Sequence, residues 1–212
     1  MGLDSMKKSS ATASRKSKGK RMSSIINRRL VRNLLRNKDG EPRAQKHAIT
    51  GEAYRAVSQM GQWIMKELIS VTKSELSSAP KAVSLPTRSI AAGHIVHAAN
   101  YLKVPPALTK DAILSAAQKT YVPTACKASN VRRMAQHHEG KTRVRKETVP
   151  VLWCLVSRLI QELIDEAVKD GEEKNRNIRL RPQILYKAIE RKMNSSLSPF
   201  KMFVGPGQGL GL

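Results

Sequence analysis

The sequence predicts an all-α protein made of two similar halves. In each half, a long segment with apolar residues at three- and four-residue steps stands between shorter helical segments, which is the pattern of an amphipathic helix. No segment alternates polar and apolar residues like a strand for more than a few residues. A helix of about 27 residues is roughly 40 Å long, and short neighbours could not cover its apolar stripe. We therefore expect the two long helices to cross, although periodicity alone also fits a generic helical bundle.

The long helix of the first half is expected from about Gly51 to Ser77. Its apolar stripe consists of Val57, Met60, Ile64, Leu68 and Val71. Pro80 ends this helix, and a short connection follows over residues 81–86. Thr87 is a suitable N-cap for a second helix that continues to about Tyr101.

The long helix of the second half is expected to begin at Thr148, which can act as its N-cap, with Pro150 tolerated in the first turn. Its stripe consists of Leu152, Leu155, Leu159, Leu163 and Ala167. The pair Asp170-Gly171 is expected to end it. After a polar stretch, residues 178–180 are expected to be briefly extended, and Pro182 opens a last helix to about Met193.

The charge of the chain indicates a polyanionic partner. Lys and Arg number 39 against 16 acidic residues, a formal net charge of +23, which opposes a compact fold unless an anion is bound. Aromatic residues are only 4% of the chain, too few for base-stacking platforms, and this favours duplex over single-stranded nucleic acid.

No run of about 20 apolar residues could span a bilayer. The two cysteines, Cys126 and Cys154, cannot form a disulfide framework of the secreted kind, so we expect an intracellular or intravirion setting.

The second half resembles the core histones of type 2A. From Pro150 to Leu185 the string PVLWCLVSRLIQELIDEAVKDGEEKNRNIRLRPQIL resembles their central fold without a gap, from the proline-valine start to the proline that opens the third helix. Upstream, Val131-Arg-Arg-Met134 resembles the first helix of that family. Arg143-Val144 resembles its first-loop arginine-valine pair.

The first half resembles the histones of type 2B more loosely. Ile49-Thr50-Gly51 stands where that family enters its long helix, and residues 81–90 resemble its second loop. Ala107 to Tyr121 resembles the extra C-terminal helix that distinguishes type 2B from other histones. A 2B-type unit followed by a 2A-type unit in one chain is similar to the fused histone doublets of giant viruses of the Marseillevirus kind.

This resemblance implies an organisation for the whole chain, with the two histone folds clasped as an intramolecular handshake, a pseudo-heterodimer. Fusion raises the effective concentration of the two units, so pairing does not depend on an encounter in solution. The implied parts are a disordered basic tail (1–24), a 2B-like fold with its extra helix (25–121), a connector (122–130), a 2A-like fold (131–195) and a short docking-type C-terminal extension (196–212).

The resemblance also implies a function: structural packaging of double-stranded DNA without sequence specificity, as the 2B–2A-like component of a nucleosome-like particle. The implied partners are double-stranded DNA and either a histone 3–4-type tetramer or a fused 4–3-type doublet. No enzymatic activity, cofactor, metal, membrane or small-molecule substrate is expected. The expected setting is the virion and viral factory of a giant virus, or the chromatin of the host nucleus.

Residues that match DNA-contacting positions of the family are expected to bind phosphates or enter the minor groove. In the folds these are Arg28, Arg29, Thr50, Lys81, Ser84, Arg132, Arg133, Arg143 and Arg179. In the tail they are Lys7, Lys8, Arg15, Lys16, Lys18, Lys20 and Arg21. The family has a basic residue where this chain has Ala82, so the contact beside Lys81 should be weaker.

The acidic surface that histones of types 2A and 2B share, and that docks other chromatin proteins, is expected to be degenerate. Only Glu166 is retained as an acid among the matching positions. The other positions hold Ala107, Ser115, Arg158, Leu163, Lys192, Met193 and Asn194. Partners that bind this acidic surface should therefore bind poorly.

Three other interpretations can be stated from the sequence. His137-His138 near Cys126 lacks regular ligand spacing, so it is a weak zinc hypothesis. A sequence-specific transcription factor with paired histone folds, similar to CCAAT-binding factors, would bind base edges in a groove. A basic ribosomal or RNA-binding protein would prefer structured RNA to duplex DNA.

Overall fold

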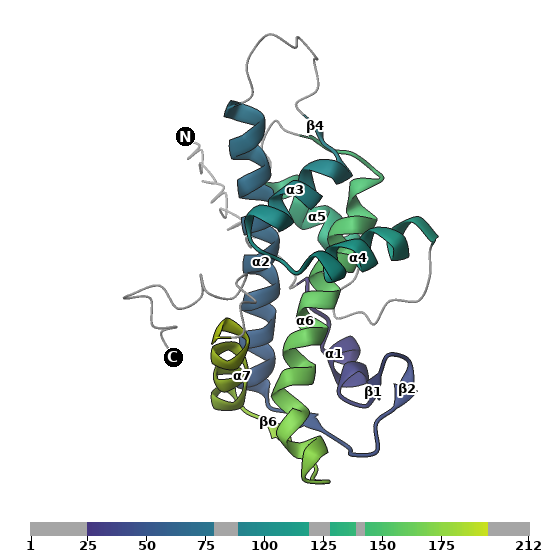
Figure 1. Cartoon of the computed structure of the whole chain (residues 1–212), viewed down its shortest axis with the longest axis vertical. Helices are drawn as coiled ribbons and strands as arrows, with labels where there is room; N and C mark the ends of the chain where they lie inside the picture. Colours follow the sequence, from purple (N-terminus) through teal and green to yellow (C-terminus); the bar gives the residue numbers. More distant parts are fainter. Residues whose placement is uncertain (1–24, 79–88, 119–127, 139–142, 195–212) are drawn as a thin grey trace, which may run out of the picture.

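The computed structural model describes residues 25–78, 89–118, 128–138 and 143–194 (Figure 1). These residues form seven helices and three pairs of two-residue strands, which confirms the all-α prediction. The helices of the first half are α1 (Arg28–Leu34), α2 (Gly51–Ser78), α3 (Ala92–Tyr101) and α4 (Pro106–Gln118). The helices of the second half are α5 (Ala128–His138), α6 (Thr148–Glu173) and α7 (Pro182–Asn194).

The long helices α2 and α6 lie side by side and run in opposite directions (Figure 1). Most stripe residues are buried, for example Val57 and Leu68 of α2 and Leu152 and Leu159 of α6. One hydrophobic cluster draws residues from both halves, so neither half has a core of its own. Full burial of one such side chain contributes about 1.5–3 kcal/mol, and this shared core holds the long helices in the contact that the sequence predicted.

Two pairs of short parallel strands join the halves at opposite ends of the α2–α6 pair. At one end β3 (Ala48–Ile49) pairs with β6 (Arg179–Leu180), and at the other β4 (Ser89–Ile90) pairs with β5 (Arg143–Val144). We call residues 46–51 together with 176–182 the β3–β6 junction, and residues 89–92 together with 143–148 the β4–β5 junction. Each strand pair uses backbone groups from both halves, so some backbone hydrogen bonds of each loop are made to the loop of the other half.

A β-hairpin interrupts the connection between α1 and α2. Its strands β1 (Asn37–Lys38) and β2 (Glu41–Pro42) pair antiparallel. The two turn residues Asp39 and Gly40 have φ of 49° and 95°, which is the geometry of a type I′ turn. This hairpin is absent from the sequence-based prediction, although the Asp-Gly pair is a strong signal for it.

The capping of α3 and α6 differs from the prediction because contacts between the halves compete with local caps, and the end of α6 also differs. The helix expected after Thr87 begins only at Ala92, because Ser89 and Ile90 are extended and pair with β5. Thr148 does not cap α6: it lies inside the helix, and its hydroxyl donates to Ile90 O at 2.9 Å. The Asp170-Gly171 pair does not end α6, which continues to Glu173.

The boundaries of the shorter helices agree with the prediction to different degrees. Helix α7 runs from Pro182 to Asn194, which confirms the start and the end expected from the sequence to within one residue. Helix α5 begins at Ala128, three residues inside the stretch expected to be a connector. Helix α4 is described as far as Gln118, and the remainder of the expected helix to Tyr121 lies outside the described residues.

Gly171 allows α6 to continue under the chain that returns toward β6. A Cβ atom at this position would overlap the Ile178 side chain and lie 2.8 Å from the backbone oxygen of Arg176. We expect Gly171→Ala to lower the free energy of unfolding by about 1–3 kcal/mol in urea denaturation, because the backbone oxygen cannot move as a side chain can. The matched control is Gly93→Ala in α3, where a Cβ would meet nothing within 4 Å. That change should be neutral or stabilise by up to about 1 kcal/mol, and an equal loss in both variants would contradict the steric explanation.

Candidate nucleic-acid interface

Each junction brings two helix N-termini together. At the β3–β6 junction α2 begins at Gly51, directly after β3, and α7 begins at Pro182, directly after β6. At the β4–β5 junction α3 begins at Ala92 and α6 at Thr148. The first turn of a helix presents unpaired N–H groups and the positive end of the helix dipole, which favour anions. Two such ends beside one strand pair form a surface suited to phosphate groups.

Exposed cations surround the β3–β6 junction. Arg179, which the sequence predicted as a DNA contact, is exposed in β6. Lys46, Arg176 and Arg181 are exposed beside it and were not among the predicted contacts. The sequence signal that could have found Arg176 and Arg181 is their position next to the extended segment 178–180, whereas Lys46 is brought to this edge only by the pairing of β3 with β6. The four side chains add positive charge where two helix N-termini already favour anions.

The β4–β5 junction also carries cations from the second half. The backbone of Arg143 pairs with Ser89, so the structure places this predicted residue in the junction. Arg145 and Lys146 follow and are exposed. Arg145 Nε donates to Ser89 Oγ at 3.1 Å, which links the loop of one half to that of the other. Arg143 and Arg179 therefore stand in equivalent places at opposite ends of the α2–α6 pair.

Thr50 has a structural part in the β3–β6 junction. Its backbone N–H donates to Leu180 O at 3.0 Å, and its Oγ1 accepts from the N–H of Ala53 at 3.2 Å. The side chain thus caps α2, while the main chain extends the pairing of the two halves. This arrangement fixes the first turn of α2, which begins with the exposed residues Gly51 and Glu52.

Four predicted arginines lie on α1 and α5, outside the two junctions. Arg28 and Arg29 are exposed on α1, and Arg132 and Arg133 are exposed on α5. The guanidinium of Arg28 lies 5.8 Å from the ring centroid of Tyr54, a cation–π distance that orients this side chain over α2. The predicted residues Lys81 and Ser84, the seven tail cations, Ala82 and the C-terminal extension lie outside the described residues.

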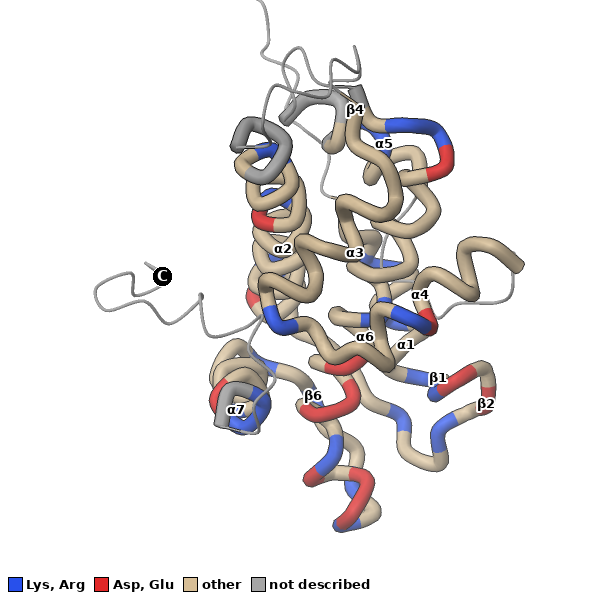
Figure 2. Tube along the Cα trace, turned by 45° about the horizontal axis from the view of Figure 1, so that its top comes forward, with Lys and Arg blue, Asp and Glu red and all other residues tan. Residues whose placement is uncertain are grey.

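The acidic residues of α6 lie in the C-terminal part of the helix (Figure 2). Each of their six carboxylates has a cation of the same chain within ion-pair distance. Arg191 binds both Glu166, at 3.2 Å, and Asp170, at 2.8 Å. Lys192 binds Glu162 at 2.9 Å. The retained acid of the expected docking surface, Glu166, is thus neutralised by α7 of its own fold.

The other positions of the expected docking surface are placed as follows. Leu163 and Ser115 are buried, which corrects the assignment of these two positions to a surface. Arg158 is mostly buried and its Nε lies 2.7 Å from an oxygen of Asp111 on α4. Ala107 is exposed, and Met193 and Asn194 lie in the last turn of α7. No acidic side chain stands at any of these positions besides Glu166.

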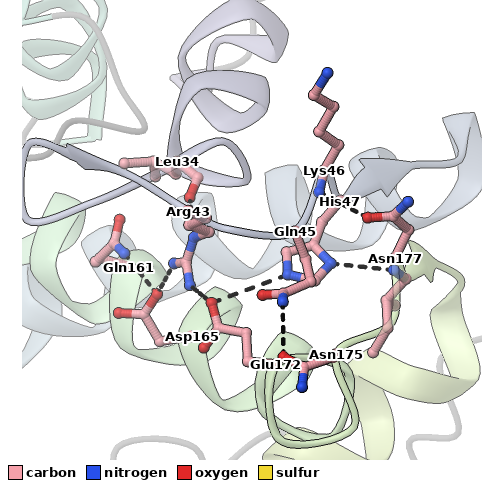
Figure 3. Close-up of polar contacts among 11 residues, drawn as sticks. Leu34, Arg43, Gln45, Lys46, His47, Gln161, Asp165, Glu172, Asn175 and Asn177 are labelled. Atoms are coloured by element: carbon pink, nitrogen blue, oxygen red, sulfur yellow. Dashed lines mark hydrogen bonds and ion pairs between the residues drawn. The ribbon is translucent and has the colours of Figure 1, made fainter.

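A buried cluster lies next to the β3–β6 junction (Figure 3). The guanidinium of Arg43, whose side chain is 1% exposed, forms ion pairs with Asp165 and Glu172 of α6. Its Nε donates to Leu34 O at 3.1 Å, and Gln161 Nε2 donates to Asp165 at 2.7 Å. The sequence did not predict this cluster, which ties the connection between α1 and α2 to the long helix of the other half.

The described part of the chain shows neither a metal site nor a membrane span. No three His, Cys, Asp or Glu side chains there gather as they would around a metal ion. Cys126, and the side chains of His137 and His138, belong to the residues that are not described. None of the helices described is both long and apolar enough to cross a membrane.

Comparisons with known proteins support the fold. The sequence matches no protein-family model, and no curated protein is similar to it at a significant level. The structure is similar to the crystal structure of the histone from Methanopyrus kandleri, with a TM-score of 0.53 and 18% sequence identity. The match covers 81% of this chain and 97% of that chain, more than either half could supply, so it extends over both. The chain therefore has an all-α histone fold.

Proposed function

We propose that this chain packages double-stranded DNA without sequence specificity. The observation that carries the proposal is the repeated arrangement at the two ends of the α2–α6 pair. Each end has a strand pair that joins the halves, two helix N-termini and exposed cations. Two equivalent phosphate-binding edges suit a ligand whose phosphates repeat at a regular spacing.

The separation of the two junctions fits duplex DNA. Helix α2 has 28 residues, and at about 1.5 Å per residue it holds the junctions roughly 40 Å apart. One turn of B-DNA advances about 34–36 Å, so both edges could meet the same face of one duplex, one turn apart. Histone octamers bind DNA through such backbone contacts, with arginines in the minor groove and no base-specific contacts.

The more specific parts of the proposal rest on the sequence resemblance. We propose that residues 25–121 act as a 2B-type unit and residues 131–195 as a 2A-type unit, fused as in the doublets of giant viruses. The proposed partner is a 3–4-type tetramer or a fused 4–3-type doublet, and the proposed setting is a giant-virus factory and virion or the host nucleus. Helix α4, which follows α3 in the first half, agrees with the extra helix of type 2B.

The test of non-specific duplex binding compares unrelated duplexes of equal length while the salt concentration is raised. We expect equal affinities and a steep salt dependence, because phosphate contacts release counterions whatever the sequence. A strong preference for one duplex would instead support a sequence-specific factor. A preference for structured RNA over duplex DNA would also contradict the proposal.

The test of packaging is reconstitution with a 3–4-type partner on duplex DNA, followed by nuclease digestion. We expect a discrete protected fragment, near or shorter than the roughly 147 bp of an octamer particle. A smear without a protected length would show binding without wrapping and would contradict the packaging function.

A further inference from the structure

His47 is a buried histidine at the entrance of β3, and its environment fixes its protonation state. Its side chain is 0% exposed, and Nδ1 accepts a hydrogen bond from the backbone N–H of Ile178 at 3.1 Å (Figure 3). A backbone N–H can only donate, so Nδ1 carries no proton and the ring is neutral with its proton on Nε2. This one bond connects the first loop of the first half to the second loop of the second half.

The bond between His47 and Ile178 continues directly into the β3–β6 junction. The backbone oxygen of Ile178 accepts from the N–H of Ala48 at 2.9 Å, and Thr50 N–H donates to Leu180 O at 3.0 Å. Arg179, the exposed cation of this edge, stands between Ile178 and Leu180. Whatever holds Ile178 in place therefore also holds the backbone of Arg179.

A second proton on His47 would break this arrangement. Protonated Nδ1 would become a donor facing the donor N–H of Ile178, and the hydrogen bond would be lost. A charged ring would also be buried, and the acid nearest to it gives little compensation. Glu172 lies 3.9 Å from Nε2, but its carboxylate already binds Arg43.

The net effect of burial and the nearby charges on His47 acts in the same direction as its hydrogen bond. Burial, which penalises the charged ring, lowers the pKa of His47 below its ordinary value of 6.5. Glu172 of α6 opposes this shift, and Arg43, from the segment before β3, adds to it. Among the described residues these are the two charged groups that act on the ring, and the net effect keeps it neutral.

We propose that His47 is a proton-sensitive latch that closes the β3–β6 junction when neutral and opens it when protonated. The folded state holds this proton less well than the unfolded or opened state, so closure is complete above pH 6.5 and weakens as the pH falls below that value. The consequence for DNA, weaker binding at the Arg179 edge in acid, rests on the proposed function. The opening of the junction itself does not depend on the proposed function.

The test of the latch is amide hydrogen exchange of the full chain without DNA. We expect the protection of the Ile178, Ala48 and Thr50 amides to fall by up to about tenfold for each pH unit below 6.5, because one proton is taken up on opening. The Arg145 amide, which donates to Ile90 O at 3.0 Å in the other junction, is the internal control. The protection of the Arg145 amide should not fall in this way as the pH is lowered.

The matched variant is His47→Asn, whose Oδ1 can accept the Ile178 N–H but takes up no proton. Its junction protection should be independent of pH, and because each protein is compared with itself, a change in overall stability cancels. Protection in the wild-type chain that does not vary with pH, or that varies equally in the variant, would overturn the latch.

Duplex binding measured at about pH 5.5 and pH 7.5 separates the latch from the proposed function. We expect acid to weaken wild-type binding several-fold relative to His47→Asn, since other protonations affect both chains alike. If exchange shows the latch but the two chains bind equally, the DNA consequence is overturned and the latch stands. If neither chain binds duplex DNA at either pH, the proposed function fails independently of the exchange result.

Discussion

Arg43→Met should lower the free energy of unfolding by about 3 kcal/mol, measured by urea denaturation with circular dichroism as the signal. Methionine keeps most of the buried stem of the side chain but removes the guanidinium between Asp165 and Glu172. Two carboxylates then remain without their cation near the core, together with the Leu34 oxygen that Arg43 Nε satisfies. The side chains of both acids are about a quarter exposed to solvent. The loss of unfolding free energy should therefore fall toward the lower end of the range for broken buried ion pairs.

Two further variants test the physical reason for this loss. Arg145→Met removes an arginine that is 44% exposed, lies 4.0 Å from Glu147 and donates to Ser89 Oγ, and because both contacts are at the surface it should cost no more than about 1 kcal/mol. Adding Asp165→Asn and Glu172→Gln to Arg43→Met removes the unpaired charges and should recover part of the stability. A loss below about 1 kcal/mol for Arg43→Met would show that the cluster contributes little to the pairing of the halves.

The long helices could be predicted from the sequence because their signal is local. The recurrence of Val57, Met60, Ile64 and Leu68 on one face of α2 is visible without knowing the partner helix. Pro182 likewise marks the start of α7, since proline suits the first turn of a helix. The contact of α2 with α6 followed from the need to cover both stripes, whereas their antiparallel direction could not be read from the pattern.

The start of α3, the contact of Thr148 and the buried cluster could not be predicted because they depend on distant residues. Arg43 is 122 residues from Asp165 and 129 from Glu172 in the sequence, and no local pattern pairs them. Thr148 has the chemistry of an N-cap, but its hydroxyl donates to Ile90 of the other half instead. The hairpin at Asp39-Gly40 is different, because its turn signal is local and was present in the sequence.

The candidate site was predictable only where a residue matched a known motif position. Arg179 was found through the resemblance of the second half to type 2A. Arg176 and Arg181 gain their importance from the pairing of β6 with β3, which places their segment beside the start of α2. A basic residue in a strongly basic chain carries little information until the fold shows which helix ends it accompanies.

Neutralising the β3–β6 junction should produce the largest loss of duplex affinity. We expect the triple variant Arg176→Gln, Arg179→Gln and Arg181→Gln to reduce the slope of log affinity against log salt by about 2.7, if each arginine contacts one phosphate. The loss should be the same for unrelated duplexes, because phosphate contacts carry no sequence information. Fluorescence anisotropy over salt from about 50 to 200 mM gives both quantities.

The matched control separates the junction from the net charge of the chain. Three exposed lysines lie outside both junctions: Lys66 on α2, Lys103 between α3 and α4, and Lys110 on α4. Changing all three to glutamine removes the same charge, so it should weaken long-range attraction but leave most of the salt slope. If the two triple variants lose equal affinity and equal slope, binding depends on total charge and the junctions have no special part. If the slope of log affinity against log salt falls only in the junction variant, the counterions are released where the strand pair and two helix N-termini meet. This is the result that the geometry of that edge requires.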